Sequence, residues 1–411
     1  MSSIRPRRSA LAAIFLTLVL DLLGFGLVLP FLSELARDNF HVSAFVAALI
    51  ASSYSLMQFL FVPIWGALSD RVGRRPVLLW SVGATCAAWI ALFFALTFGE
   101  SVVWLFIVRG FAGVATANIA AASAYIADVT PPERRAKGMA LIGIGFGIGF
   151  MFGPALGGLL ANYPVFGHAG GLPCLVAAAL SALNFLWVLF GLPESLPAEK
   201  RASTTGAKRS RATLLQVFSR PGIGLCVLLN FLIIVSFTNL DQTFRIFNAD
   251  KFALTPGQTG AIFAWIGLCA AITQGAVRPL SDKLSAHGMI TAGLVIQAIG
   301  FALLALSPRV GVTALWAAAG TIAVGNGLTQ PSVSAYISRR AKAHEQGEVL
   351  GASQAWSALG RVIGPAIGGF LYASTGPSSP YMTAAAGMAI ASLMAIGLAR
   401  TPALTEAEAS A

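Results

Sequence analysis

The sequence predicts an all-α membrane protein, and three observations support this. Of its 411 residues, 56% are hydrophobic and only 10% are charged, and the mean hydropathy is +0.78. Soluble domains carry roughly 25% charged residues, so most of this surface is expected to face lipid. The apolar runs last about 20 residues, the length of a helix that crosses a hydrocarbon core of about 30 Å. A β-barrel would show alternating segments of about 10 residues, so we expect helices.

Apolar runs bounded by charged residues, Pro or Gly predict twelve spans. Their expected limits are residues 10–32, 43–68, 76–97, 101–127, 137–161, 170–192, 221–244, 258–280, 287–307, 311–337, 347–373 and 379–399. The first run follows a basic N-terminus, as in a signal peptide. However, it is too long, contains Asp21 and lacks a clear small-residue cleavage site, so we expect a spanning helix.

Positive charge is concentrated in alternate loops. With a cytoplasmic N-terminus, 21 of the 27 Lys and Arg residues lie on the cytoplasmic side and 4 outside, with Arg109 and Arg361 inside spans. Cytoplasmic loops of membrane proteins carry such an excess, so we predict that both termini are cytoplasmic. The net charge of +11 then reflects membrane orientation, and we expect no nucleic-acid partner.

A polar, basic linker divides the chain. We predict an N-terminal six-helix bundle over residues 1–192, a cytoplasmic linker over 193–220 and a C-terminal six-helix bundle over 221–411. The linker is interpreted as a flexible tether on anionic lipid, and a folded amphipathic element is the alternative.

Three segments of the first half return in the second, in order. The pairs are Leu68–Gly73 with Leu280–Ser285 (offset 212), Ser123–Asp128 with Ser334–Arg339 and Gly153–Gly158 with Gly364–Gly369 (both offset 211). Because six spans separate equivalent points, the copies share one membrane orientation. Parallel repeats of this kind bind substrate between the halves, near the membrane midplane.

The loop GALSDRVGRRPVLLW concentrates charge between two apolar spans. Its distinctive residues are Gly66, Asp70, Arg71, Gly73, Arg74 and Arg75. Glycine permits a tight turn, and the aspartate can pair with a nearby arginine. The alternative is that basic residues only hold the loop inside, but this explains neither the aspartate nor the glycines.

The loop resembles the signature loop of the major facilitator superfamily, and the resemblance covers essentially the whole chain. Four further segments are similar to its drug:proton antiporter branch, and most to bacterial tetracycline efflux proteins: Leu20–Pro30, Arg109–Asp128, Gly143–Gly158 and Leu183–Ser195. The resemblance implies twelve helices in two pseudo-symmetric bundles. It also implies a cytoplasmic gate in which Asp70, Arg74 and Asp128 lock onto the start of span 11 when the cavity opens outward.

Two spans carry glycine at every fourth position. In span 5 these are Gly145, Gly149, Gly153 and Gly157, with Pro154 and Gly158 in the same motif; in span 11 they are Gly360, Gly364 and Gly368. A face of small residues lets another helix approach closely. Either the halves rock on these faces, or the faces provide ordinary tight packing. Pro154 and Pro365 are expected to bend their helices.

Asp21 is the most informative residue, because a charge within the bilayer needs a partner or a proton. At about 1.5 Å per residue, Asp21 and Arg109 are expected at similar depths from opposite ends of their spans. Burial favours a neutral acid and a nearby cation favours the charged form. We therefore predict that Asp21 and Arg109 couple transport to protons, with a static buried ion pair as the alternative.

Other polar residues within the spans have weaker interpretations. We favour Asn118, Gln330 and Gln354 as substrate contacts. Asp241 and Arg245 are interpreted as a surface ion pair near the outer end of span 7. Tetracycline pumps carry acids in helices 3 and 9 where this chain has Ala88 and Gln297.

The prediction is a proton-coupled antiporter of a bacterial inner membrane that exports amphipathic drugs, with tetracycline as the leading substrate. It is expected to function as a monomer, with protons, lipid and a small drug-like molecule as partners. Uptake of a small metabolite by symport or facilitation is the alternative, and a sensor without flux is a third possibility. No nucleophile–base set, metal cluster or P-loop stands out, so we expect no catalytic residue, metal or cofactor.

Overall fold

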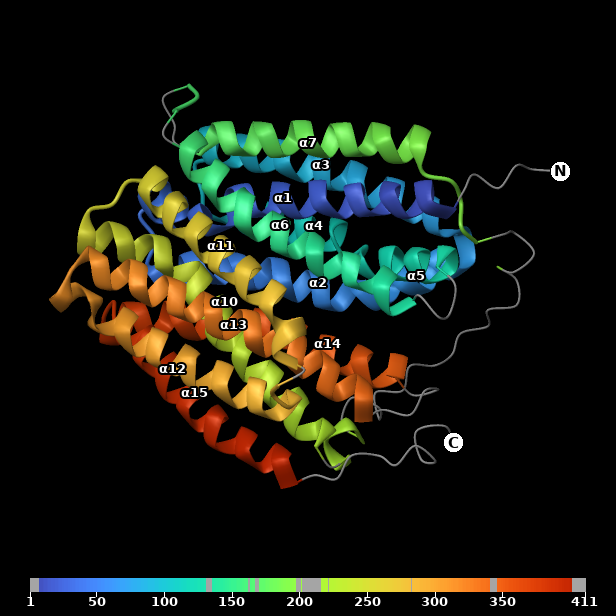
Figure 1. Ribbon diagram of the computed structural model, residues 1–411. Helices are drawn as coiled ribbons and strands as arrows, with labels where there is room; N and C mark the ends of the chain where they lie inside the picture. Colours follow the sequence, from blue (N-terminus) through green and yellow to red (C-terminus); the bar gives the residue numbers. More distant parts are fainter. Residues whose placement is uncertain are drawn as a thin grey trace. The chain divides into compact units, whose positions relative to one another are not determined.

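The computed structural model describes residues 7–130, 135–161, 163–166, 170–196, 201, 216–220, 222–281, 283–340 and 346–400. All elements of these residues are helices (Figure 1). They are α1 (Arg7–Phe40), α2 (Ala44–Val72), α3 (Arg74–Phe98), α4 (Val103–Ala115), α5 (Ile119–Val129), α6 (Arg135–Ala161), α7 (Gly171–Gly191), η2 (Val217–Ser219), α10 (Ile223–Phe252), α11 (Pro256–Ser281), α12 (Ala286–Val310), α13 (Val312–Arg340), α14 (Gln346–Thr375), α15 (Ser379–Ile396) and η3 (Gly397–Arg400).

Ten stretches of the described residues are long and apolar enough to cross a membrane. They are Ala10–Phe40, Ala44–Val72, Arg74–Phe98, Val103–Val129, Gly171–Gly191, Ile223–Phe252, Pro256–Val277, Ala286–Val310, Val312–Ile337 and Ser379–Ala399. Helices satisfy their own backbone hydrogen bonds, which is why such apolar runs fold this way in lipid. The prediction of an all-helical membrane protein is confirmed.

Contacts between residues divide the chain into two compact units. Unit 1 consists of Met1–Ser43, Ser53–Lys208 and Thr255–Phe263; unit 2 consists of Ala44–Ser52, Arg209–Leu254 and Ala264–Ala411. Within unit 1, α7 lies beside α1 and α3, and within unit 2, α12 lies beside α13 and α15 (Figure 1).

The predicted span at 101–127 is broken by a short turn. Helix α4 ends at Ala115, and the N–H of Ala117 then donates to the carbonyl oxygen of Val114 at 3.3 Å, three residues back instead of four. Helix α5 then restarts, with the N–H of Ala122 bonded to the carbonyl oxygen of Asn118 at 2.9 Å. The turn places the side chain of Asn118 against α1, as described below.

The glycine faces pack inside the units. A Cβ on Gly149 would lie 2.7 Å from the backbone of Leu22, and one on Gly153 would lie 2.6 Å from Gly26, so this face of α6 packs closely on α1 within unit 1. A Cβ on Gly360 would lie 3.1 Å from Ile234, so the corresponding face of α14 packs on α10 within unit 2. These contacts are those of tight helix packing within one unit, and rocking of the halves on these faces stays a prediction.

Gly158, the last glycine of the span 5 motif, packs against a different helix. A Cβ on Gly158 would lie 2.9 Å from Gly260, near the start of α11. Both α6 and α14 continue through their prolines, Pro154 and Pro365, without a break.

Candidate functional site

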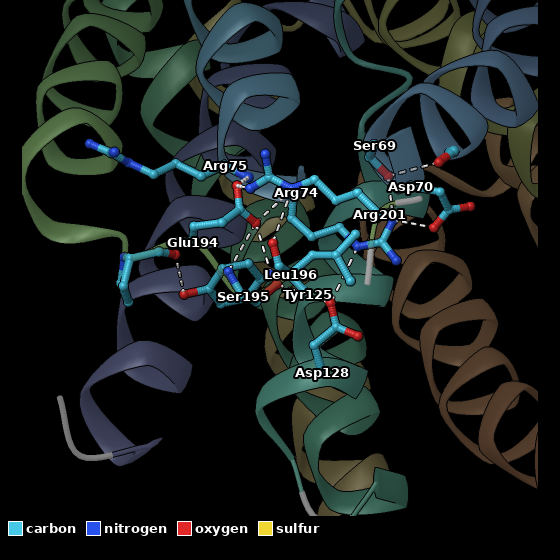
Figure 2. Close-up of polar contacts among 12 residues, drawn as sticks. Ser69, Asp70, Arg74, Arg75, Tyr125, Asp128, Glu194, Ser195, Leu196 and Arg201 are labelled. Carbon is cyan, nitrogen blue, oxygen red and sulfur yellow. Dashed lines mark hydrogen bonds and ion pairs between the residues drawn. The ribbon is translucent and has the colours of Figure 1, made fainter. Parts of the chain in front are cut away.

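The charged loop between α2 and α3 is built around Arg74, which is 7% exposed. Its Nη1 pairs with Asp70 at 2.5 Å and donates to the hydroxyl of Ser69 at 2.7 Å. Its Nε donates to Asp128 on α5 at 3.3 Å, and the hydroxyl of Ser195 donates to the same carboxylate oxygen at 3.0 Å (Figure 2). The structure thus brings together Asp70, Arg74 and Asp128.

Glu194 holds the other side of this network and was not predicted as a site residue. Its carboxylate accepts hydrogen bonds from the backbone N–H groups of Arg74 at 2.9 Å and Arg75 at 3.2 Å, which begin α3 (Figure 2). An anion at a helix N-terminus satisfies free N–H groups and opposes the helix dipole. The N–H groups of Ser195 and Leu196 donate to the same side chain, both at 3.0 Å.

The backbone conformation and the surroundings of Gly73 require a glycine at this position. Its φ is +107°, which L side chains rarely adopt, and a Cβ there would meet the Glu194 carboxylate and the Arg201 guanidinium. Arg201 pairs with Glu194 at 3.5 Å. The glycine therefore leaves room for the carboxylate that caps α3.

The other predicted gate residues have simpler surroundings. Arg75 donates through Nη2 to the carbonyl oxygen of Leu189 at 2.5 Å, and Gly66 faces Ala120. Arg71 is exposed. The side chains at the start of span 11, which the resemblance places in the lock, lie outside the described residues.

Asp21 on α1 is partly buried and takes its hydrogen bonds from two amides. Asn184 on α7 donates to its Oδ1 at 3.0 Å, and Asn118, just before α5, donates to its Oδ2 at 3.4 Å. Asn184 is fully buried. One carboxylate in a membrane helix thus joins three helices of unit 1.

Arg109 is 1% exposed and does not provide these hydrogen bonds. Its guanidinium lies 4.3 Å from the centre of the Tyr54 ring, a cation–π arrangement. Within the part of the chain that the structure describes, its Nε and Nη2 have no hydrogen-bond partner. The Tyr54 hydroxyl accepts hydrogen bonds from Thr116 at 2.7 Å and Gln58 at 3.2 Å. The expected contact between Asp21 and Arg109 is thus replaced by two amide donors at Asp21 and an aromatic ring at Arg109.

The predicted substrate residues lie in different environments. Asn118 is 7% exposed and occupied with Asp21, Gln330 on α13 is half-buried, and Gln354 on α14 is exposed. Ala88 is buried, and Gln297 donates to the hydroxyl of Thr329 at 3.1 Å.

Asp241 and Arg245 on α10 are not a surface pair, and that prediction is wrong. They are 5% and 3% exposed, because α10 continues to Phe252, eight residues past the predicted end of the span. Gln242 donates to Oδ2 of Asp241 at 2.9 Å, and Arg245 donates to the carbonyl oxygen of Leu254 at 2.7 Å.

The membrane helices and the charged loop between α2 and α3 are typical of a facilitator-type transporter. Comparison with known sequences leads to the same class. The sequence model of the Major Facilitator Superfamily matches residues 14–248 and 226–411, and the chain belongs to this family. It is a multi-pass membrane protein and a transporter rather than an enzyme.

Its relatives include drug-resistance proteins. The chain is 33% identical over 374 residues to the tetracycline resistance protein, class C, of Escherichia coli, covering 89% of this chain and 90% of the relative. It is 34% identical over 376 residues to the class E protein of the same organism, covering 89% and 87%. The predicted resemblance to tetracycline efflux proteins is confirmed.

Other similar proteins include a vertebrate branch. Major facilitator superfamily domain-containing protein 10 of Bos taurus is 30% identical over 449 residues, covering 93% of this chain and 91% of the relative. The structure is similar to that of the human organic anion transporter MFSD10 (TETRAN), with a TM-score of 0.71, 24% identity and coverage of 95% and 100%. A bacterial homologue of the human lysosomal transporter Spinster, inward-facing and occupied, gives a TM-score of 0.75 at 14% identity, covering 98% and 99%. These structural similarities show the fold.

Proposed function

We propose that the protein is a proton-coupled efflux antiporter that exports an amphipathic drug by alternating access, with tetracycline as the first candidate. It works as a monomer in a bacterial inner membrane, with both termini in the cytoplasm. Residues 1–192 and 221–411 act as pseudo-symmetric six-helix bundles, joined by a cytoplasmic linker over residues 193–220. The twelve spans are the ten apolar stretches together with α6 and α14.

The observation that carries this proposal is the position of Asp21. An acid within a membrane helix needs a partner or a proton, and its partners here are two neutral amides from separate helices. A neutral amide can donate to the charged carboxylate and accept from the protonated acid, so it supports both states. Movement of α5 or α7 against α1 would change how well the charged form is held, which is the physical requirement for coupling.

The cytoplasmic network supports alternating access. Arg74 is held by two carboxylates and Glu194 fixes the first turn of α3, so the loop is a rigid charged platform. We infer that Gly66, Asp70, Arg71, Gly73, Arg74, Arg75 and Asp128 form or flank the cytoplasmic gate. The close packing at Gly149, Gly153, Pro154, Gly157 and Gly158 would keep α6 rigid against its neighbours while the gate opens.

A resistance assay tests the drug-efflux proposal. The wild-type protein and Asp21→Asn are expressed at matched levels in a host lacking its own efflux pumps, and growth is measured across a panel that includes tetracycline. We expect resistance from the wild-type protein and none from the variant. Unchanged sensitivity to the whole panel would contradict drug efflux, and substrate entry driven by an inward proton gradient would favour symport.

An organic anion is a second candidate cargo, favoured by Arg109. Two of its N–H donors are buried without partners, which is costly unless another group binds them in some state of the cycle. A carboxylate is the group that a guanidinium binds best. The human protein MFSD10, which has a similar fold, is an organic anion transporter, and this supports testing anionic dyes in the same assay.

A further inference from the structure

A second buried polar segment lies on α10 in unit 2, and the mechanism above does not use it. Six polar side chains within ten residues are each at most 5% exposed: Asn239, Asp241, Gln242, Thr243, Arg245 and Asn248. Elsewhere α10 is apolar enough to be a membrane span. Polar groups in this setting are retained mostly at functional positions.

Asp241 lies deep along the helix. It follows the first residue of α10 by eighteen positions and precedes the last by eleven, which places it about 27 Å and 16 Å from the two ends at about 1.5 Å per residue. An acid at such a depth needs a cation or a proton. Its hydrogen-bond donor is the amide of its chain neighbour Gln242, at 2.9 Å.

A polar face leads from Asp241 towards the outer end of α10. Asp241, Arg245 and Asn248 are spaced four and three residues apart, so they share one face of the helix. Arg245 donates to the carbonyl oxygen of Leu254 at 2.7 Å, in the turn that follows the helix. The backbone N–H of Leu254 donates to the carbonyl oxygen of Asn248 at 3.2 Å.

Asn248 has a buried amide group that simple packing in an apolar core does not explain. It is 0% exposed, and neither its Nδ2 nor its Oδ1 has a hydrogen-bond partner among the described residues. A buried amide without partners costs free energy unless a mobile group uses it. An unused donor and an unused acceptor between Asp241 and the outer turn are suited to a water or a proton in transit.

We propose that Asp241 is a second proton-binding site, filled from the outer end of α10 along the face of Arg245 and Asn248. The inference deepens the proposed function, because it adds a carrier of the coupled ion in the other unit. Described charged or titratable groups on the elements that pack against α10 are Tyr381 on α15, Arg361 and Tyr372 on α14, and Tyr336 and Arg340 on α13, with Arg220 beside η2. Asp241 is the buried carboxylate among the described side chains of this segment, and we assign the exchangeable proton to it.

The first test needs no cargo. Infrared difference spectra of the full-length protein in liposomes, recorded while the external pH is raised, report the C=O stretch of protonated carboxyl groups. We expect one component of the lost band to be absent in Asp241→Asn and shifted in Asp241→Glu, which keeps a carboxyl group if the amide variant misfolds. Asp250→Asn is the matched control, since Asp250 is an exposed acid on the same helix that accepts a hydrogen bond from Tyr372 at 2.7 Å. A band identical in wild type and Asp241→Asn would overturn the proposal, as would displacement of the proton by sodium at constant pH.

The second test asks whether that proton is coupled to transport. The limiting accumulation of tetracycline in everted vesicles is measured against imposed pH gradients. Losing one coupled proton lowers the limiting ratio of internal to external tetracycline about tenfold per pH unit of gradient. Each tenfold step in this ratio corresponds to about 1.4 kcal/mol. We expect this loss in Asp241→Asn and not in Asp250→Asn. If accumulation by the wild type depends on the pH gradient and Asp241→Asn accumulates the same amount, the inference about Asp241 is wrong while the proposed function stands. If accumulation by the wild type does not depend on the gradient, the proposed function is wrong, and the infrared spectra alone test Asp241.

Discussion

Asn184 on α7 donates a hydrogen bond to Asp21 on α1 at 3.0 Å, and the same nitrogen donates to the carbonyl oxygen of Thr17 at 3.2 Å. The second bond fixes the amide to the α1 backbone, so the donor remains aimed at the carboxylate. Asp21 is therefore positioned by its own helix and by a neighbour.

Replacing Asn184 with leucine tests this positioning. Removing a hydrogen bond to a charged group costs about 1.5–3 kcal/mol, so we expect gradient-driven drug accumulation to fall at least about tenfold. Ser181→Ala is the control, because the buried Ser181 hydroxyl, on the same helix, has no hydrogen-bond partner. Equal accumulation in the two variants would show that Asn184 does not position Asp21.

Arg74→Lys tests the ion-pair network of the loop between α2 and α3. Lysine keeps the charge, but it cannot reproduce the separate bonds that Nη1 and Nε make to Asp70 and Asp128. We expect the transport rate to fall about tenfold or more, as measured by drug efflux from loaded cells. Arg71→Lys, at an exposed position in the same loop, is expected to keep the wild-type rate. An active Arg74→Lys protein would contradict the role of the planar guanidinium.

Glu194→Ala is expected to destabilise the start of α3. The carboxylate accepts the N–H groups of Arg74 and Arg75, which begin α3, and loss of a helix cap costs about 0.5–2 kcal/mol. The measurement is the thermal unfolding midpoint in detergent, which should fall by several degrees. Glu100→Ala, at an exposed position after the other end of α3, should not change it. If the two variants unfold at the same temperature, the cap contributes no stability.

Two glycines of α6 provide a matched pair. A Cβ on Gly157 would overlap the backbone of Leu27, whereas one on Gly147 would meet nothing within 4 Å. We expect Gly157→Ala to lower the free energy of unfolding by about 1–3 kcal/mol, because overpacking displaces α1. Gly147→Ala should be neutral or raise it by about 0.5–1 kcal/mol, as alanine favours a helix. Denaturant titration of both variants measures the difference, and equal stabilities would contradict the packing described for α6.

The sequence was sufficient to predict the class of the protein and an ion pair in the loop between α2 and α3. Composition and run length predict membrane helices, and the order of Asp70, Gly73 and Arg74 predicts the loop whose ion pairs the structure contains. These features follow from local chemistry: apolar length, an i,i+4 pair and a glycine with positive φ.

The surroundings of the buried charges could not be predicted in this way. Depth along a helix does not tell which direction a side chain faces, so Arg109 was expected beside Asp21 but lies on the Tyr54 ring. The turn at Thr116–Asn118 has no proline or glycine to signal it, although it aims Asn118 at Asp21. Asp241 was placed at a surface because hydrophobicity ends before the helix does.

In the proposed mechanism, Asp21 binds and releases a proton that drives export. Proteoliposomes containing wild-type protein or Asp21→Asn are loaded with drug, and drug movement is followed with and without a pH gradient, together with drug-for-drug exchange at equal pH. We predict that the wild-type protein accumulates drug against its gradient when protons flow the other way. Asp21→Asn should still exchange drug for drug, but the drug accumulation that it reaches in response to the pH gradient should fall well below that of the wild type. A variant that accumulates drug as the wild type does would contradict the account.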